Sequence, residues 1–375
     1  MAWVLFRVDA GAAIGSGHWM RCLTLADRLH EEGYDCVFIS AQQLPGLVER
    51  TLARGHHHYP LAPVAMDEAD DRQPRYSHSR WLATDEIQDA QRVETCLAGL
   101  RQRLGANPSW IVVDHYALAA PWEERFTPTA PVLAIDDLHD RPHQARWVLD
   151  QTAGKTPDVY DGRMLNADGE LLLGADYALL RPEFIRCRPA SLARRTQPRP
   201  GADRLLLTLG GVDADNISLW VLQALLPLQS SLDVEVVVGA AYPHWDELQH
   251  WCDAHWPSCR RYRQVDDMAE RMVAADLCIG AAGSTSWERC CLGLPTVQLQ
   301  LADNQRHIAH YLDKVGAALN FGLPASGRET ELAEWVQDVM QHPQRLQHLS
   351  QQAAALCDGT GVERVVARLK AGAWQ

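Results

Sequence analysis

The chain has 375 residues, 47% of them hydrophobic and 22% charged, which is enough apolar material for the buried cores of two domains. Its formal net charge of −13 argues against a non-specific nucleic-acid binder, which needs a basic surface, although backbone N–H groups and helix N-termini can still hold a nucleotide. We expect no signal peptide, because the opening residues are typical of a strand, and no membrane span, because no apolar run reaches ~18 residues. The composition therefore predicts a soluble, cytoplasmic protein.

Short apolar runs alternate with longer helical stretches in the first half of the chain. The predicted strands lie at 3–8, 36–40, 110–113, 132–135 and 147–149. Helices are predicted at 18–32 and 85–104, and the polar, proline-containing segment 62–76 is expected to be a loop. Repeated strand–helix–strand order is typical of a parallel sheet with helices on both faces.

The segment 189–203 is rich in proline and poor in apolar residues, which favours a linker. After it the pattern restarts, with strands predicted at 204–209, 233–238, 277–279 and 296–300. Helices are predicted at 217–226, 245–255, 286–292, 304–315, 331–341 and 343–356. The fold class is therefore α/β, with two Rossmann-like, doubly wound domains at 1–188 and 204–375. A ligand is expected in the cleft between them, beyond the carboxyl ends of the strands.

A glycine-rich loop follows the first predicted strand. Gly15 and Gly17 allow close approach of a ligand to the backbone, and the next helix presents free N–H groups. The third small residue of a dinucleotide fingerprint is replaced by Met20, so nicotinamide and flavin cofactors are disfavoured and no cofactor is expected. His18 lies at the helix N-terminus, where the helix dipole disfavours protonation. A neutral His18 fits a general base or, equally, a residue that only caps the helix.

Two loops of the second half have similar chemistry. Gly210 and Gly211 link a strand to a helix, which suits a phosphate or an ordinary turn. The stretch 280–288 ends in small and hydroxyl residues at a helix start, a pattern that can bind a diphosphate without a metal. The diphosphate-binding candidates in this stretch are Gly283, Ser284, Thr285 and Ser286.

Three polar residues near these loops have two interpretations each. Glu288 can accept hydrogen bonds from both ribose hydroxyls, or it can complement the helix dipole. Asn304 and Gln305 can reach the sugar or the leaving phosphate, or they can cap a helix.

Histidine and cysteine are common metal ligands, but their arrangement in this sequence does not indicate a metal site. The run of histidines at 56–58 is more typical of a surface loop, because adjacent side chains point in different directions. The ten cysteines are scattered without a C-x-x-C pair, which predicts reduced and mostly buried thiols.

Several of these motifs together resemble a known family, the UDP-2,4-diacetamido-2,4,6-trideoxy-β-L-altropyranose hydrolases of pseudaminic acid biosynthesis, a pathway linked to flagellin glycosylation. The most specific motifs are RVDAGAAIGSGHWMRC at 7–22, GSTSWERC at 283–290 and Asn304-Gln305. Weaker similarity occurs at 114–116, 135–137, 179–184 and 209–211, so the resemblance spans most of the chain.

The resemblance implies a GT-B architecture, like that of the glycosyltransferase that makes lipid II, and metal-free hydrolysis of a UDP-sugar with inversion at C1. It gives His18 the role of general base and Glu288 that of ribose ligand. Tyr116 and Asn304 match positions near the sugar and the leaving group, and Arg21 falls within the first motif as a substrate-binding candidate. The segment 62–76 does not align, and the sequence predicts neither the exact sugar nor an oligomeric state.

Two other functions are compatible with these residues. A GT-B glycosyltransferase would use a sugar hydroxyl or lipid carrier in place of water, and a basic, apolar membrane-facing patch would favour it. A non-catalytic nucleotide-sugar-binding module would keep Glu288 and the second-half loops without needing His18. In each case the expected partner is a UDP-sugar, with no nucleic acid and no membrane.

Overall fold

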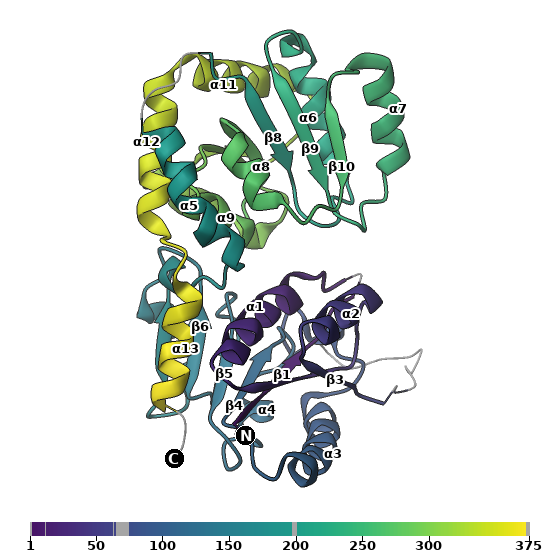
Figure 1. Ribbon diagram of the computed structural model, residues 1–375, viewed down its shortest axis with the longest axis vertical. Helices are drawn as coiled ribbons and strands as arrows, with labels where there is room; N and C mark the ends of the chain where they lie inside the picture. The colour runs from purple at the N-terminus through teal and green to yellow at the C-terminus, as the bar shows by residue number, and fades with distance from the viewer. Residues whose placement is uncertain (1, 12, 63, 65–74, 197–200, 373–375) are drawn as a thin grey trace. The chain divides into compact units, whose positions relative to one another are not determined.

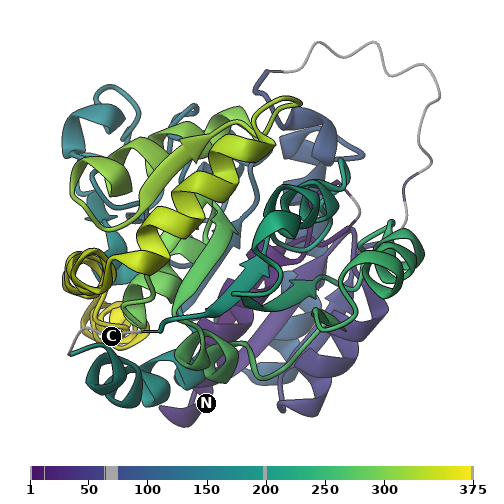
Figure 2. The same cartoon turned by 90° about the horizontal axis from the view of Figure 1, so that it is seen from above.

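A computed structural model describes the chain except residues 1, 12, 63, 65–74, 197–200 and 373–375 (Figure 1). The chain divides into two compact units, 1–179 with 361–375, and 180–360. Each unit is built around one parallel sheet with helices on both sides, as the second view also shows (Figure 2). The predicted fold class of two Rossmann-like units is confirmed.

The sheet of unit 1 has seven parallel strands in the order β3-β2-β1-β4-β5-β6-β7. Their bounds are β1 Trp3–Val8, β2 Asp35–Ser40, β3 His57–Pro60, β4 Trp110–Asp114, β5 Val132–Ile135, β6 Trp147–Asp150 and β7 Glu170–Leu173. The central strand β1 is buried along its whole length, as expected for an apolar run covered on both faces. Strand order reverses between β1 and β4, so the carboxyl ends of these two strands are where a ligand site is expected.

The helices of unit 1 pack on the two faces of this sheet. They are α1 Gly17–Glu31, α2 Pro45–Ala53, α3 Glu86–Leu104, α4 Ala120–Glu124 and α13 Gly361–Gly372. The start and end of α3 are set locally, because the Asp85 side chain accepts the Gln88 N–H at 2.7 Å and Gly105 adopts the left-handed backbone (φ 76°). The last helix, α13, comes back from unit 2 and packs against α1 (Figure 1).

The sheet of unit 2 has six parallel strands in the order β10-β9-β8-β11-β12-β13, with its reversal between β8 and β11. The strands are β8 Arg204–Thr208, β9 Asp233–Val238, β10 Arg260–Arg263, β11 Leu277–Ala281, β12 Thr296–Leu299 and β13 Leu319–Gly322. The helices are α5 Pro182–Arg195, α6 Ile217–Leu225, α7 Trp245–His255, α8 Met268–Ala274, α9 Thr285–Cys291, α10 Arg306–Lys314, α11 Glu329–Gln341 and α12 Pro343–Leu356. Helix α6 packs with α11, whereas α5 packs with α8, α9 and α12.

The unit boundaries differ from those expected from the sequence. The first part of the expected linker 189–203, up to Arg195, is the second half of α5, with Pro189 inside the helix. Buried Arg195 anchors this half, because its guanidinium donates to the carbonyls of Met272 and Ala275, both at 2.8 Å. Residues 197–200 of the expected linker lie outside the described residues. Helix α13, which was expected in the second domain, belongs to unit 1, because the end of the chain packs against that unit.

The run of histidines was wrongly predicted as a loop. His57 and His58 lie in edge strand β3, where the His58 ring pairs with the Ser40 hydroxyl at 2.8 Å, and His56 precedes the strand, buried against Asp27 at 2.8 Å. Most of the expected loop 62–76 lies outside the described residues. All ten cysteines are free, as predicted. Over the described ranges, no helix has the length and apolar character needed to cross a bilayer.

Candidate functional site

His18 lies where the fold of unit 1 places ligands. The chain leaves β1, turns through Gly15 in the left-handed region (φ 78°) and enters α1 at Gly17. A Cβ added to Gly17 would meet no atom within 4 Å, so internal packing does not require glycine there and space remains for a ligand. His18 is the second residue of α1 and is 8% exposed.

The imidazole of His18 is fixed by a buried carboxylate. Its Nδ1 lies 2.6 Å from Oδ1 of Asp114, the last residue of β4. Arg21, one turn along α1, donates to both oxygens of Asp114, at 2.6 and 2.7 Å. Burial would raise the pKa of Asp114, but the charge of Arg21 and the hydrogen bonds from Arg21 and His18 outweigh it and hold that pKa well below its usual range. Asp114 is therefore an anion that accepts the Nδ1 proton.

This arrangement decides which nitrogen of His18 can act as a base. With the proton on Nδ1, a neutral imidazole keeps its lone pair on Nε2. Both contacts of the imidazole, with Asp114 Oδ1 at 2.6 Å and with Arg21 Nη2 at 3.2 Å, are made by Nδ1, so Nε2 has no hydrogen-bond partner among the residues that the structure describes. The same logic operates in carboxylate–histidine pairs of hydrolases, where the carboxylate sets the tautomer and the far nitrogen accepts a proton.

Arg21 and Tyr116 meet at a second carboxylate. Asp137 follows β5 and accepts a hydrogen bond from Arg21 Nη1 at 3.1 Å and another from the Tyr116 hydroxyl. Burial raises the pKa of Tyr116 well above its ordinary value, and the Asp137 carboxylate adds to the rise, so the phenol is neutral. Because its proton goes to Asp137, the Tyr116 oxygen can only accept a further hydrogen bond. Arg21, expected to touch substrate, is occupied by two carboxylates and holds the site together.

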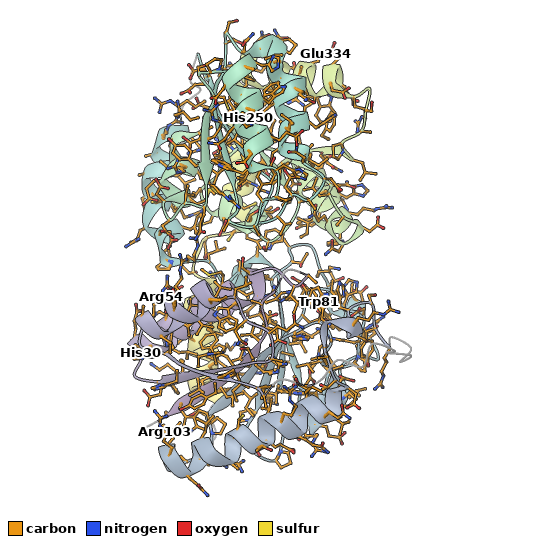
Figure 3. The ribbon with its side chains drawn as sticks, turned by 90° about the vertical axis from the view of Figure 1, so that its right-hand side faces the viewer. His30, Arg54, Trp81, Arg103, His250 and Glu334 are labelled. Atoms are coloured by element: carbon orange, nitrogen blue, oxygen red, sulfur yellow. The ribbon has the colours of Figure 1, made fainter. Side chains whose placement is uncertain are left out.

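An aromatic cluster borders His18. The rings of Trp81 and Tyr116 are stacked, with centroids 5.4 Å apart, and His18 meets both edge-on at 5.8 and 4.5 Å. His78 completes the cluster, 4.6 Å from Trp81 and 5.2 Å from Tyr116. Trp81, labelled in Figure 3, ends the short 3-10 helix η1 (Ser79–Trp81) and is half-buried.

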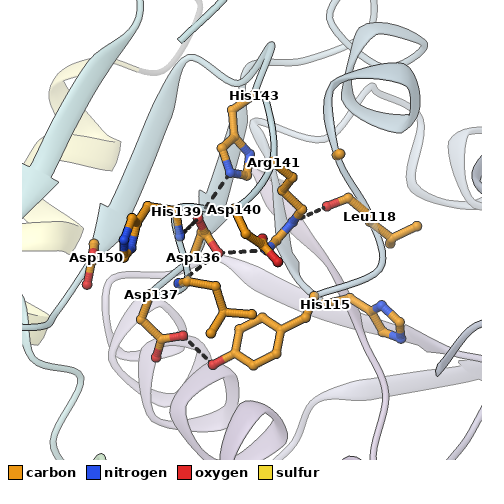
Figure 4. Close-up of polar contacts among 12 residues, drawn as sticks. His115, Leu118, Asp136, Asp137, His139, Asp140, Arg141, His143 and Asp150 are labelled. Carbon is orange, nitrogen blue, oxygen red and sulfur yellow. Dashed lines mark hydrogen bonds and ion pairs between the residues drawn. The ribbon is translucent and has the colours of Figure 1, made fainter. Parts of the chain in front are cut away.

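A buried ionic network supports the loops that carry Tyr116 and Asp137 (Figure 4). Arg141 pairs with Asp136 at 2.8 Å and donates to the Leu118 carbonyl at 2.9 Å, so it ties the loop after β5 to the loop after β4. His143 lies between Glu123 and Asp136, at 2.7 and 3.3 Å. Burial would lower the pKa of His143, but these two carboxylates raise it to about 9. The network fixes the backbone from which the site residues project.

In unit 2, the glycine turn after β8 is formed by close backbone packing. A Cβ on Gly239 would lie 2.2 Å from the Gly211 carbonyl oxygen, so the loops after β8 and β9 touch through glycine. Gly210 has φ 103°, and both Gly210 and Gly211 are exposed. The Asp213 carboxylate accepts the N–H groups of the first residues of α6, both at 2.8 Å, and therefore serves as its cap. Gly211 remains accessible to a phosphate.

The hydroxyl residues at the start of α9 differ in their environments. Ser286 is 1% exposed, and its oxygen receives hydrogen bonds from Arg289 at 3.0 Å and Gln298 at 3.1 Å. Arg289 also donates to the Thr285 hydroxyl at 3.0 Å. Ser284 is exposed and Gly283 is half-buried. Ser286 was expected to bind substrate, but the structure uses its hydroxyl inside the unit, whereas Ser284 and the adjoining backbone remain available.

Glu288 lies beside an arginine from the start of α5. The Arg181 guanidinium lies 3.6 Å from Glu288 and 2.9 Å from Glu183, so it is shared between two carboxylates. Burial raises the pKa of Glu288, and the Arg181 charge opposes the rise. Glu288 is half-buried and lies 3.6 Å from Arg181, so its carboxylate oxygens can still accept hydrogen bonds from the two hydroxyls of a ribose.

Asn304 and Gln305 form a 3-10 turn before α10, η5 (Asp303–Gln305), so the helix begins two residues later than predicted. The Gln305 side-chain oxygen accepts the Leu301 N–H at 2.9 Å. Its amide nitrogen lies 4.0 Å from the position of a Cβ on Gly283, which places Gln305 next to the α9 loop. Asn304 is exposed.

The structure thus brings the predicted residues together in two groups, one in each unit. In unit 1 the group is Gly15, Gly17, His18, Arg21 and Tyr116, and in unit 2 it is Gly283, Ser284, Thr285, Glu288 and Gln305. Sequence reasoning did not assign Asp114, Asp137, Arg181 or Trp81 to the site. Asp114 directly follows a predicted strand and Asp137 lies two residues after another, which was a usable signal, whereas Trp81 follows a segment without a pattern. Within the described ranges, no three His, Cys, Asp or Glu side chains are grouped as a metal site requires.

Comparison with known proteins connects unit 2 to sugar-transfer enzymes. Residues 205–365 match the glycosyltransferase family 28 C-terminal domain, a segment that covers most of unit 2 and the start of α13. The spore coat polysaccharide biosynthesis protein SpsG of Bacillus subtilis is 30% identical over 200 residues, 52% of this chain and 57% of that protein. A UDP-N-acetylglucosamine–N-acetylmuramyl-(pentapeptide) pyrophosphoryl-undecaprenol N-acetylglucosamine transferase of Coxiella burnetii is 27% identical over 181 residues, 47% of this chain and 50% of that protein.

The similarity of fold extends over the whole chain. The crystal structure of MurG from Acinetobacter baumannii superposes with a TM-score of 0.68 at 15% identity, covering 99% of each chain. The fold is therefore GT-B, and unit 2 carries a glycosyltransferase-like domain. The chain spans only about half the length of the two curated relatives.

Proposed function

We propose that the protein hydrolyses a UDP-sugar to UDP and free sugar, with inversion at C1 and without a metal ion. The observation that carries the proposal is the Asp114–His18 pair, which leaves Nε2 of the imidazole ready to take a proton from water. The resemblance of the motifs around His18 and Glu288 to pseudaminic acid hydrolases supports UDP-2,4-diacetamido-2,4,6-trideoxy-β-L-altropyranose as the substrate. The ten free cysteines fit a reducing compartment, so we infer that the reaction takes place in the cytoplasm.

In the proposed reaction, Nε2 of His18 removes a proton from a water molecule on the face of the sugar opposite the diphosphate. The water oxygen bonds to C1 while the C1–O bond to the diphosphate breaks, and the electron pair leaves with UDP. Asp114 stabilises the imidazolium that forms, as its buried negative charge favours that cation. UDP is a good leaving group, so the scheme needs no protonating carboxylic acid.

The glycine and serine loops of unit 2 are proposed to hold UDP. Exposed Gly211 and Ser284 follow β8 and β11, the two strands at which the sheet order reverses, and this is where open sheets bind ligands. Their N–H groups offer fixed dipoles to the departing diphosphate. Glu288 accepts the ribose hydroxyls in this scheme, and Asn304 and Gln305 face the sugar or the β-phosphate.

The test is incubation of the protein with UDP-2,4-diacetamido-2,4,6-trideoxy-L-altrose and EDTA, with UDP and sugar quantified by chromatography. We expect stoichiometric release of both. The His18→Asn variant is the matched control, and we expect it to lose roughly 10²–10⁴-fold in kcat while binding the UDP-sugar as wild type does. A variant within ~3-fold of the wild-type kcat would remove His18 from its role as base.

A second candidate is a GT-B glycosyltransferase, favoured by the family 28 match of residues 205–365. The same base would then activate an acceptor hydroxyl in place of water. The two functions differ in one readout, because a transferase releases UDP quickly only when an acceptor is added, whereas a hydrolase needs none. Binding of UDP-sugars without turnover under either condition would favour a non-catalytic binding module.

A further inference from the structure

We propose that Arg289 is a positioning residue for the diphosphate of the ligand, and that its buried charge attracts the diphosphate through the hydroxyl of Thr285. This role rests on the proposed function, because it concerns the loop of unit 2 that is assigned to UDP. It adds a residue that the motifs did not single out, a cation that is only 2% exposed and lies behind that loop.

The chain makes room for this guanidinium at the end of β11. Arg289 lies on α9, one turn after Thr285, and its side chain reaches back to the last residue of β11. A Cβ on Gly280 would lie 2.6 Å from Nη1 of Arg289 and 2.8 Å from its Cζ, so a larger residue at that position would displace the guanidinium. Glycine weakens the interior of a strand, and here it lets a charged group lie against the backbone. Because β11 is one of the two strands at which the sheet order reverses, the cation lies where a ligand is expected.

The hydrogen bonds of this guanidinium go to neutral oxygens. Nη2 donates to the Ala281 carbonyl at 2.7 Å and to the Ser286 hydroxyl at 3.0 Å, and Nη1 donates to the Thr285 hydroxyl at 3.0 Å. Arg289 forms no ion pair with any residue that the structure describes, and the adjacent carboxylate, Glu288, has its ion-pair contact with Arg181 at 3.6 Å and senses the Arg289 charge only from beyond that distance. Taking a charge out of water is costly, and buried charges are as a rule paired with an opposite charge. A bound diphosphate supplies that opposite charge.

Thr285 connects the buried charge to the surface of the loop. It is half-buried and directly follows the exposed Ser284. Its oxygen accepts the hydrogen bond from Arg289, and its hydroxyl proton has no acceptor among the described residues. A hydroxyl that accepts from a cation is polarised and becomes a stronger donor, most of all where the dielectric is low. The Thr285 hydroxyl can therefore donate to a phosphate oxygen, and the Arg289 charge strengthens that bond.

The test compares three ligands that share the nucleoside and differ in the number of phosphate groups, namely uridine, UMP and UDP. Calorimetry measures the Kd of each for wild type, Arg289→Met and Arg289→Lys, and thermal unfolding shows whether each variant is folded. The matched control is Arg195→Met, which removes another buried guanidinium of unit 2, one that donates to the Ala275 carbonyl at 2.8 Å beside the opposite end of β11. Binding is measured without turnover, so absence of hydrolysis would contradict the proposed function and leave this test intact.

We expect Arg289→Met to weaken UDP binding by roughly 10–100-fold, the range for hydrogen bonds to charged groups, and uridine binding by less than ~3-fold, with UMP between them. Arg289→Lys keeps the charge, so it should lose clearly less UDP affinity than Arg289→Met does. Arg195→Met should bind all three ligands as wild type does.

Thr285→Val tests the connecting hydroxyl, and it also serves if Arg289→Met does not fold. It should weaken UDP binding by about tenfold at unchanged uridine affinity. The proposal is overturned if folded Arg289→Met or Thr285→Val keeps the wild-type affinity for UDP, or if uridine affinity falls by the same factor as UDP affinity. An equal loss of UDP affinity in Arg289→Lys and Arg289→Met also overturns it, because the charge would then have no part in binding.

Discussion

Replacement of Asp114 by Asn tests how the structure prepares His18. The substitution keeps the size of the side chain but removes its charge, and its amide nitrogen now points a donor at Nδ1 of His18, 2.6 Å from the former carboxylate oxygen. A histidine facing a donor places its proton on Nε2. The nitrogen assigned to accept a proton from water would then have no lone pair to do so.

The Asp114→Asn substitution has two separate effects, one on turnover and one on the stability of the fold. Loss of the correct tautomer in a carboxylate–histidine pair reduces turnover by up to about 10⁴-fold, a value known from a serine protease. Loss of a buried charge opposite Arg21 destabilises the fold by roughly 3 kcal/mol, at the low end for broken buried pairs because Arg21 keeps Asp137. Activity should therefore fall much further than the folded fraction.

The assay measures kcat and KM for UDP release together with the thermal unfolding midpoint. We expect kcat to fall by about 10²–10⁴-fold at unchanged KM, with a folded protein at the assay temperature. Asp27→Asn is the matched control, because it removes the carboxylate partner of His56 at 2.8 Å, far from His18, and should leave kcat unchanged. An Asp114→Asn variant that is folded and turns over at the wild-type rate would refute the tautomer argument.

Two further predictions concern UDP binding and stability. Glu288→Ala should weaken UDP binding by roughly tenfold through loss of the charged acceptor for the ribose hydroxyls, and unchanged affinity by calorimetry would refute that contact. Burial and the nearby Asp137 charge raise the pKa of Asp150 to about 7. The protonated carboxyl therefore stabilises the folded state to its full extent below the ordinary Asp pKa, and that stabilisation is lost as the pH rises through 7. Between pH 5 and 8 this loss of stability amounts to about 3 kcal/mol, so the unfolding midpoint of wild type should decline with pH. Asp150→Asn should flatten that decline, and an equally steep decline in the variant would contradict the role of Asp150.

Most of the fold could be predicted from the sequence, because central parallel strands are continuous apolar runs. Each such strand of both sheets was found, and the four that were missed, β3, β7, β10 and β13, are edge strands. An edge strand is partly exposed and carries polar residues, such as the sequence Arg-Arg-Tyr-Arg of β10, so it lacks the apolar signal. The return of α13 to unit 1 is a tertiary contact that no local pattern predicts.

The glycine loops and His18 could be located from the sequence, because each lies between a predicted strand and a predicted helix and is therefore marked by local pattern. Their environments could not be predicted. Ser286 looked like a ligand group until its hydroxyl was found to accept hydrogen bonds from Arg289 and Gln298. Asp114 lies 96 residues from His18 in sequence, so only the pairing of β1 with β4 brings them together.

Metal-free hydrolysis by water is tested by incubation of the protein with UDP-2,4-diacetamido-2,4,6-trideoxy-L-altrose in H₂¹⁸O with EDTA, followed by NMR and mass spectrometry. We expect release of UDP without an acceptor, ¹⁸O on C1 of the sugar, unlabelled UDP, and an initial product of inverted anomeric configuration. Label on the β-phosphate of UDP, retention at C1, or release of UDP only after an acceptor is added would contradict it.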